Sequence, residues 1–197
     1  MSQFIESIKV EDQKAFLLDL HQQRVRETFA HFGKECCIDL EKIFKDLEHD
    51  EDGLYKLRIV YDLEGNFRAQ MLPYAFPEIE SFELVENNDF SYDFKFADRT
   101  EFEKMKKKAR AQEIIIVKNG QITDTSFSNL IFLKNQTWHT PKSFLLNGVQ
   151  RQNLLKQGII KETEITLQNL NEFSHFQLIN SMNEFNQDFV YSIEELK

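Results

Sequence analysis

The chain has 197 residues, of which 41% are hydrophobic and 19 are phenylalanine, so it has enough apolar surface for a packed globular core. Its 33 acidic and 24 basic side chains give a net charge of -9, which disfavours nonspecific binding to nucleic acid or to an anionic membrane. A local basic pocket for a small anion remains compatible with this charge.

The cysteines and the hydrophobic runs indicate the cellular compartment. Cys36 and Cys37 are adjacent, so they cannot staple distant segments together. The N-terminus lacks a basic stretch followed by an apolar core, and the longest aliphatic run, 114–117, is far too short to span a bilayer. We therefore expect a cytoplasmic protein without a transmembrane helix.

The first half of the chain predicts both strands and helices. Leu17, Leu20, Val25 and Phe29 recur at helical spacing, and Gly33 follows as a residue typical of a helix C-terminus. In chain order we expect a strand over 4–10, this helix over 17–29, a short helix over 39–47, a hairpin of strands 55–61 and 67–72, and strands over 79–85 and 90–96. These elements would form an α+β lobe over residues 1–94.

The second half predicts mainly strands. Asp98 is the expected N-cap of a charged helix that ends near Arg110, and Asn119-Gly120 is typical of a tight hairpin turn. The other expected elements are strands over 113–117, 122–123, 130–133, 137–139, 159–165 and 176–179, and a helix over 148–157 that ends at Gly158. They would form a β-rich lobe over residues 95–197. Because no nucleotide-binding glycine fingerprint or phosphate-loop signature occurs, nucleotide folds are disfavoured.

Five motifs follow one another between residues 112 and 151. They are the Ile-rich strand 113–117, the Asn119-Gly120 turn, Ile122-Thr-Asp-Thr-Ser-Phe-Ser-Asn-Leu, Thr140-Pro141, and Leu145-Leu-Asn-Gly-Val-Gln-Arg151. In this order they resemble the cofactor-binding half of the fold-type IV pyridoxal-phosphate (PLP) enzymes, which include the branched-chain and D-amino-acid aminotransferases and 4-amino-4-deoxychorismate lyase. The resemblance implies a compact, two-lobed α+β fold of that type, with PLP as cofactor in the second lobe and no metal.

Lys95 lies where the family carries its Schiff-base lysine. Its expected strand places Phe90, Tyr92, Phe94 and Phe96 on one face and Lys95 on the other. Periodicity alone favours a solvated lysine on an edge strand, whereas the resemblance implies the catalytic residue. The rival lysines share a charged helix that is typical of a solvated face: Lys104, Lys106, Lys107 and Lys108.

By the same resemblance, Asp124 is the acidic partner of the cofactor's ring nitrogen, where a carboxylate keeps the pyridinium protonated. Most aminotransferases of this group carry Glu there, and short members close to the lyase branch carry Asp. From its residue type alone, Asp124 also suits a turn after the hairpin. Asn129, together with Ser128, is expected to order this loop.

The phosphate site is expected where a helix begins after Gly148. Backbone N–H groups at a helix N-terminus attract anions, and glycine permits a close approach. Leu20-His21-Gln-Gln-Arg24 resembles the family's phosphate-binding His-x-x-Arg. The resemblance thus implies cofactor contacts from Arg24, Leu146, Gly148, Val149, Gln150, Asn180 and Ser181, with Leu146 on the ring face. The family more often has Leu-Pro-Gly-Ile-Thr-Arg, so Asn147 and Gln150 depart from its pattern.

Arg58 and Arg99 are the candidate ligands for a substrate carboxylate. Arg58 alternates with apolar neighbours in 55–61, and either arginine is equally compatible with an exposed charge on a strand or helix. The chain opens at Phe4-Ile-Glu-Ser-Ile8 without the Gly-Asp-Gly loop usual in relatives. Part of the substrate wall is therefore expected to be missing or supplied by a second subunit.

The resemblance implies a small-molecule carboxylate substrate and a homodimer. The leading hypothesis is a lyase-branch enzyme that eliminates pyruvate to give 4-aminobenzoate for folate synthesis, with Lys95 as both anchor and general base. An aminotransferase that acts on amino acids and 2-oxo acids remains an alternative. A noncatalytic protein that has kept the fold is a third reading, which the departures at Asp124, Asn147 and Gln150 keep open.

Overall fold

The computed structural model describes residues 2–47, 52–186 and 190–196. The chain forms two compact units: unit 1 consists of Met1–Phe76 and Phe94–Asp98, and unit 2 of Pro77–Asp93 and Arg99–Lys197. This division differs from the expected boundary at 94/95. Strand β5 (Phe82–Glu86) belongs to unit 2 because it pairs in parallel with β6 (Glu113–Lys118), whereas Lys95 belongs to unit 1 because its carbonyl accepts a hydrogen bond from Ile5 N at 2.9 Å.

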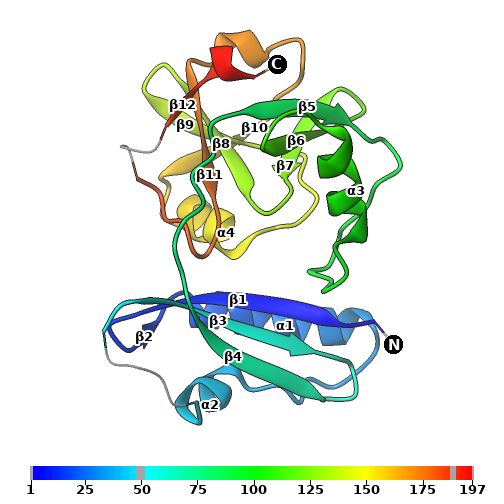
Figure 1. Cartoon of the computed structure of the whole chain (residues 1–197), viewed down its shortest axis with the longest axis vertical. Coiled ribbons are helices and arrows are strands. Elements are labelled where there is room, and N and C mark those ends of the chain that lie inside the picture. The colour runs from blue at the N-terminus through cyan, green and yellow to red at the C-terminus, as the bar shows by residue number, and fades with distance from the viewer. Residues whose placement is uncertain (1, 48–51, 187–189, 197) are drawn as a thin grey trace. The chain divides into compact units, whose positions relative to one another are not determined.

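Unit 1 is a four-stranded antiparallel sheet with helices on one face (Figure 1). Its elements are β1 (Phe4–Glu11), β2 (Lys14–Ala15), α1 (Leu18–His31), α2 (Leu40–Lys45), β3 (Leu54–Tyr61) and β4 (Phe67–Pro73), with strand order β2-β1-β3-β4. Buried and partly buried residues alternate along β1, so one side of the strand faces the core. Val25 and Phe29 of α1 pack there with Ile8, Leu57 and Ile59.

Unit 2 contains a five-stranded and a three-stranded sheet, ordered β10-β9-β8-β11-β12 and β5-β6-β7 (Figure 1). Its further elements are α3 (Thr100–Lys108), β7 (Gln121–Thr125), β8 (Asn129–Lys134), β9 (Thr137–Pro141), α4 (Val149–Lys156), β10 (Ile160–Thr163), η1 (Leu170–Glu172), β11 (His175–Ile179), β12 (Tyr191–Ser192) and η2 (Ile193–Glu195). The two sheets share one core, in which Phe82, Ile115, Phe132 and Phe176 are fully or almost fully buried.

The turns predicted from Asn and Gly are confirmed. Asn119 and Gly120 have φ of 51° and 74°, the positive values that a two-residue hairpin loop requires. Gly33 and Gly158 follow α1 and α4 with φ of 66° and 70°, as expected for glycines just beyond a helix.

The predicted strand over 90–96 is wrong. The alternating aromatic residues fill two separate environments: Phe90 and Tyr92 pack edge-on against Phe102, each at 4.9 Å between ring centroids, while Phe94 and Phe96 pack against the core of unit 1. Phe96 forms a single bridge with Phe4. Alternation here therefore reflects two packing sites rather than one strand face.

The predicted cap at Asp98 is also wrong, because α3 begins at Thr100 with Arg99 as its N-cap and with no side-chain cap bond. None of the helices in the described ranges combines the length and apolarity needed to cross a lipid bilayer.

Candidate active site

Asp124 is a buried carboxylate near the end of β7, and it is held by uncharged donors. Its Oδ1 accepts a hydrogen bond from Asn129 Nδ2 at 2.9 Å, and its Oδ2 accepts from Leu145 N at 3.1 Å and Leu146 N at 2.9 Å. A carboxylate offers about four acceptor positions, so one is left for a further donor. Asp124 thus joins the hairpin to the loop that precedes α4.

The electrostatic environment of Asp124 is unusual for an aspartate. Burial raises its pKa from 3.8 to about 6, and the hydrogen bonds from Leu146, Asn129 and Leu145 and the charge of Arg151 oppose this rise only in part. The negative charge is therefore poorly compensated in the protein as described. A cation placed beside it would be stabilised, because opposite charges attract strongly where water is excluded.

Gly148 is required by the packing of Asn129. A Cβ at position 148 would lie 2.1 Å from Asn129 Oδ1, so any other residue would require the Asn129 side chain to move. Asn129 Nδ2 also donates to Leu146 O at 2.8 Å. The sequence reasoning explained Gly148 by close approach of a phosphate, but the structure supplies a reason within the chain itself.

The first turn of α4 has the chemistry of an anion site. Gly148 is its N-cap, so none of the described side chains caps the helix there, and Val149 and Gln150 are buried. Uncapped N–H groups and the helix dipole favour an anion at this end. Gln150 stands where the family more often has a hydroxyl residue, and its Oε1 accepts a bond from Asn153 Nδ2 at 3.4 Å.

Arg151, the last residue of the same motif, forms hydrogen bonds to the loop that precedes α4. It donates to Asn147 Oδ1 at 3.0 Å, to Pro141 O at 3.1 Å and to Glu162 Oε1 at 2.5 Å. Its guanidinium also lies over the Phe144 ring, 4.5 Å from the centroid. The motif arginine therefore fixes the loop over 141–147 that carries the donors to Asp124.

Asn180 closes a turn and joins it to the hairpin loop. Its Oδ1 accepts from Met182 N and Asn183 N, both at 2.8 Å, and its Nδ2 donates to Ser128 Oγ at 2.8 Å. Ser181 lies within this turn and is partly buried. The structure thus brings Asn180 and Ser128 together; contact of Asn180 and Ser181 with a phosphate stays a prediction.

Unit 1 contains a second buried polar group, formed by Glu6, His21 and Arg24. Arg24 Nε donates to Glu6 Oε1 at 2.9 Å, Arg24 Nη2 donates to Glu6 Oε2, and His21 Nδ1 lies 2.6 Å from Glu6 Oε2. Burial alone would raise the pKa of Glu6, but the Arg24 charge and the His21 hydrogen bond outweigh it and lower the pKa to about 2. Glu6 is thus a charged, paired carboxylate.

His21 carries an orphaned polar atom beside this pair. Burial lowers its pKa, against the contribution of Glu6, and the nearby charges of Arg24 and Lys95 act in the same direction as burial. The neutral ring then donates from Nδ1 to Glu6, a tautomer inferred from the hydrogen bond. Its buried Nε2 has no hydrogen-bond partner among the described residues, which is the arrangement expected where a polar ligand binds.

Lys95 lies on a segment that runs along the free edge of β1. Besides the bond from Ile5 N to its carbonyl, Ala97 N donates to Gln3 O at 2.8 Å. The electrostatic influence of Lys95 on His21 places its charge near the Glu6–His21–Arg24 group. The structure therefore groups Lys95 with Arg24 in unit 1, two of the residues predicted from the resemblance.

The two candidate substrate arginines have different surroundings. Arg58 lines a surface cavity of about 740 Å³ in unit 1, together with Gln3, Asn66, Arg68 and Gln70. Arg99 instead donates to the backbone carbonyl of Ser126, and its guanidinium lies over the Phe102 ring at 4.6 Å. Arg58 is thus accessible to a ligand, while Arg99 has a structural partner within unit 2.

Sequence reasoning missed Glu6 and Glu113, both buried carboxylates with basic partners. A signal for Glu6 existed, since it shares the buried face of β1 with Phe4, Ile8 and Val10. A carboxylate at such a position requires a buried partner. The partner itself, 18 residues away, could not be read from the spacing.

The family model for class IV aminotransferases matches residues 3–186 of the chain. The protein is therefore a member of the class IV aminotransferase family. This membership confirms the fold-type IV PLP-enzyme fold expected from the motifs, and it indicates a PLP-dependent enzyme without distinguishing a lyase from a transferase.

Similar proteins come from several bacteria. A crystal structure of a Haemophilus somnus protein named as a candidate 4-amino-4-deoxychorismate lyase is 33% identical, has a TM-score of 0.87, and matches over 94% of this chain and 98% of its own. A Haemophilus influenzae protein described as uncharacterized is 29% identical over 93% of this chain and 99% of its length. A PLP-bound Mycobacterium tuberculosis protein described as a hypothetical aminotransferase shares the fold, with 16% identity, a TM-score of 0.76, and coverage of 98% and 81%.

The residues present fit a PLP cofactor. Within unit 2, Asp124 provides a poorly compensated negative charge and the first turn of α4 provides uncapped N–H groups. Within unit 1, His21 provides an orphaned buried nitrogen. No group of three or more metal-binding side chains was found in the described ranges.

Proposed function

We propose that this protein is a PLP-dependent lyase, similar to 4-amino-4-deoxychorismate lyase, that releases pyruvate from its substrate and leaves 4-aminobenzoate for folate synthesis. The observation that carries the cofactor assignment is Asp124, a buried carboxylate with a raised pKa that is held by neutral donors. The choice of a lyase is supported by the 33% identical relative, which is named as a candidate lyase and matches this chain over 98% of its own length.

When bound, PLP supplies an electron-withdrawing ring that stabilises negative charge developing on the substrate. In the proposed arrangement Asp124 holds the proton on the ring nitrogen. The N–H groups of Val149 and Gln150 and the turn at Asn180 and Ser181 would bind the phosphate within unit 2. Leu146 would pack on the ring, and Asn129 orients Asp124 through their hydrogen bond.

Lys95 is proposed to anchor the cofactor and then to act as the general base. Its Nζ would remove one proton from a ring carbon of the substrate as the bond to the enolpyruvyl oxygen breaks. The released enol takes up a proton and becomes pyruvate, while the ring becomes aromatic. The position of Lys95 near Arg24 and His21, whose pKa its charge lowers, supports this role.

The cavity in unit 1 supports a carboxylate substrate. Arg58 and Arg68 line it together with three amide side chains, those of Gln3, Asn66 and Gln70. Guanidinium groups bind carboxylates through paired hydrogen bonds. Arg99 is the weaker candidate, because its guanidinium is engaged with Ser126 and Phe102.

An aminotransferase is the second candidate function, because the match to the class IV aminotransferase family does not distinguish it from a lyase. It would require the same site to accept an amino acid and a 2-oxo acid in turn. Either activity is expected in a homodimer, which sedimentation would test.

The first experiment is the visible absorption spectrum of the purified protein with PLP, alongside the Lys95→Ala variant. Lys104→Ala is a matched control, because Lys104 is 60% exposed and pairs with Glu101 on α3. We expect a band from the lysine-bound cofactor that only Lys95→Ala abolishes, and borohydride reduction should fix the adduct on Lys95.

Assays of pyruvate release and of amino-group transfer then separate the two activities. Pyruvate release without an amino-acceptor supports the lyase. Transfer between amino acids and 2-oxo acids supports the alternative. Cofactor binding without either reaction would contradict both and favour a noncatalytic protein.

A further inference from the structure

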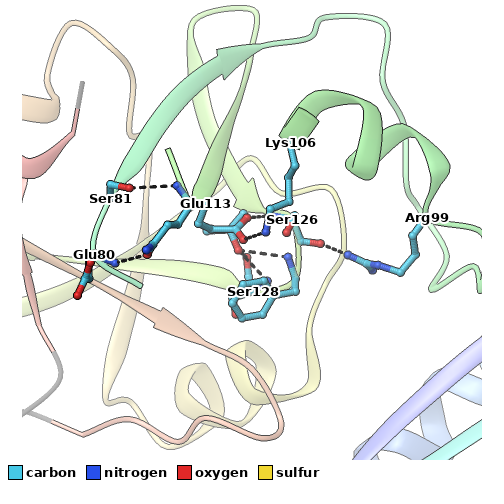
Figure 2. Close-up of polar contacts among 10 residues, drawn as sticks. Glu80, Ser81, Arg99, Lys106, Glu113, Ser126 and Ser128 are labelled. Atoms are coloured by element: carbon cyan, nitrogen blue, oxygen red, sulfur yellow. Dashed lines mark hydrogen bonds and ion pairs between the residues drawn. The ribbon is translucent and has the colours of Figure 1, made fainter. Parts of the chain in front are cut away.

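Glu113 is a buried carboxylate at the start of β6 that contacts the loop after β7. Its side chain is 1% exposed. Its Oε1 accepts a hydrogen bond from Ser126 N at 2.9 Å, and its Oε2 pairs with Lys106 Nζ at 2.7 Å (Figure 2). A buried carboxylate without partners is costly, so the bonds from Ser126 and Lys106 are needed to keep it in place.

Arg99 binds the backbone of Ser126 through its carbonyl group. Its Nη2 donates to Ser126 O, while Glu113 accepts from Ser126 N, so both backbone polar groups of Ser126 bond to charged side chains (Figure 2). The Arg99 guanidinium is also fixed by the rings of Phe102 and Tyr92, at 4.6 and 6.0 Å. Charge-assisted bonds of this kind are stronger than ordinary backbone bonds.

The loop held in this way carries residues of the proposed cofactor site at its end. Thr125 N donates to Ser128 O at 2.8 Å, and Ser128 N donates to Thr125 Oγ1 at 2.9 Å, which closes a tight turn. Ser128 Oγ then accepts from Asn180, and Asn129 donates to Asp124. A shift of Ser126 would therefore move both contacts.

We propose that Glu113, with Lys106 and Arg99, is a positioning group that fixes the turn over 125–128 and thereby aligns Asn129 and Asp124 for the cofactor. This inference rests on the proposed function for its consequence, but the fixing of the turn is independent of any cofactor. It assigns Lys106 a role that its place on a charged helix did not suggest, and it makes Arg99 a positioning residue rather than a substrate ligand.

The test compares two lysines on the same helix. Lys106→Met removes the partner of buried Glu113, whereas Lys104→Met removes the partner of Glu101, whose side chain is 53% exposed. Glu113→Gln is the second variant, because it keeps the shape and one acceptor if Lys106→Met folds poorly. Hydrogen exchange of the amides of residues 126–129 is measured without cofactor, and PLP affinity is measured by absorption titration.

We expect Lys106→Met and Glu113→Gln to accelerate exchange at Ser126 and its neighbours by roughly tenfold or more, and to weaken PLP binding by a similar factor. Lys104→Met should change neither quantity. Unchanged exchange at 126–129 would overturn the positioning role, as would faster exchange with unaltered PLP affinity. If the unmodified protein binds no PLP, the proposed function and the cofactor part of this inference fail together, while the exchange data still decide whether Glu113 fixes the turn.

Discussion

The two units each bury a carboxylate, Glu6 and Asp124, but their pKa values move in opposite directions. Glu6 faces the Arg24 guanidinium, which lowers its pKa to about 2 against the effect of burial. Asp124 accepts hydrogen bonds only from uncharged donors, and these bonds together with the Arg151 charge do not outweigh burial, which raises its pKa to about 6. Burial by itself therefore does not decide the state of a carboxylate; the charge of the partner does.

This difference gives the two groups different roles. The charge of Glu6 is already neutralised by Arg24, and their hydrogen bonds hold the Arg24 guanidinium in place. The charge of Asp124 is compensated only in part, so Asp124 is suited to a cation such as a protonated ring nitrogen. The predictions below test whether the partner accounts for this contrast.

The largest effect is expected from Glu6→Gln. It leaves the Arg24 charge buried without a counter-charge, which typically costs about 3–5 kcal/mol of unfolding free energy. Urea denaturation measures the loss. Glu11→Gln, on the same strand, is the control, because the Glu11 carboxylate pairs with Lys9 but is 41% exposed. A loss for Glu6→Gln no larger than for Glu11→Gln would contradict the account.

The two carboxylates should dominate stability in different pH windows. The raised pKa of Asp124 favours the folded state when this group is protonated, so its contribution is complete below about pH 4 and is lost as the pH rises through about 6. The lowered pKa of Glu6 stabilises the folded state above about pH 4.5, and this stabilisation is lost as the pH falls towards 2. Each carboxylate contributes about 3 kcal/mol to the free energy of unfolding in its own pH window.

Thermal unfolding across this pH range measures both contributions. Asp124→Asn should reduce the loss of stability between about pH 4 and 6 and leave the loss below pH 4.5 unchanged. Glu6→Gln should instead reduce the loss of stability below pH 4.5. Identical profiles for the two variants would show that the contrast between the carboxylates is absent.

Gly148→Ala should displace Asn129, because the added Cβ would lie 2.1 Å from Asn129 Oδ1. Overpacking of this kind typically costs about 1–3 kcal/mol. Asn129→Ala in the same chain should recover much of the loss, since it removes the atom that clashes, and a double-mutant cycle measures the coupling. Additive losses in the double variant would refute the proposed contact.

The smallest effect on stability is expected from Asp124→Asn at pH 7. No charged partner is stranded, so the change should stay within about 1.5 kcal/mol. PLP affinity should nevertheless fall by roughly tenfold or more, because a charge-assisted bond to the ring nitrogen is lost. Calorimetry and absorption titration measure the two quantities, and unaltered PLP affinity would count against Asp124 as the ring partner.

The sequence predicted the parts of the fold that local rules determine. Asn119-Gly120 forms its hairpin, and α2 lies within the predicted range 39–47, because each depends on residues within a few positions. The parallel pairs β5–β6 and β9–β10 and the path of residues 90–98 depend on contacts between distant segments. Spacing along the chain carries no information on such contacts.

The same limit applies to the candidate site. Lys95, Asp124 and Gly148 were predicted from motifs, because the resemblance to the family depends on the order of short local segments. Glu113 was not found, since its role follows from bonds to Lys106 and Ser126 that only the folded chain brings together.

The most direct test of the central claim is the titration of the Asp124 carboxyl carbon by NMR, without and with PLP, with Asp124→Asn to assign the signal. The account predicts a pKa of about 6 without cofactor and a much lower pKa once the ring nitrogen provides a positive partner. A pKa near 3.8 without cofactor, or one that PLP does not change, would contradict it.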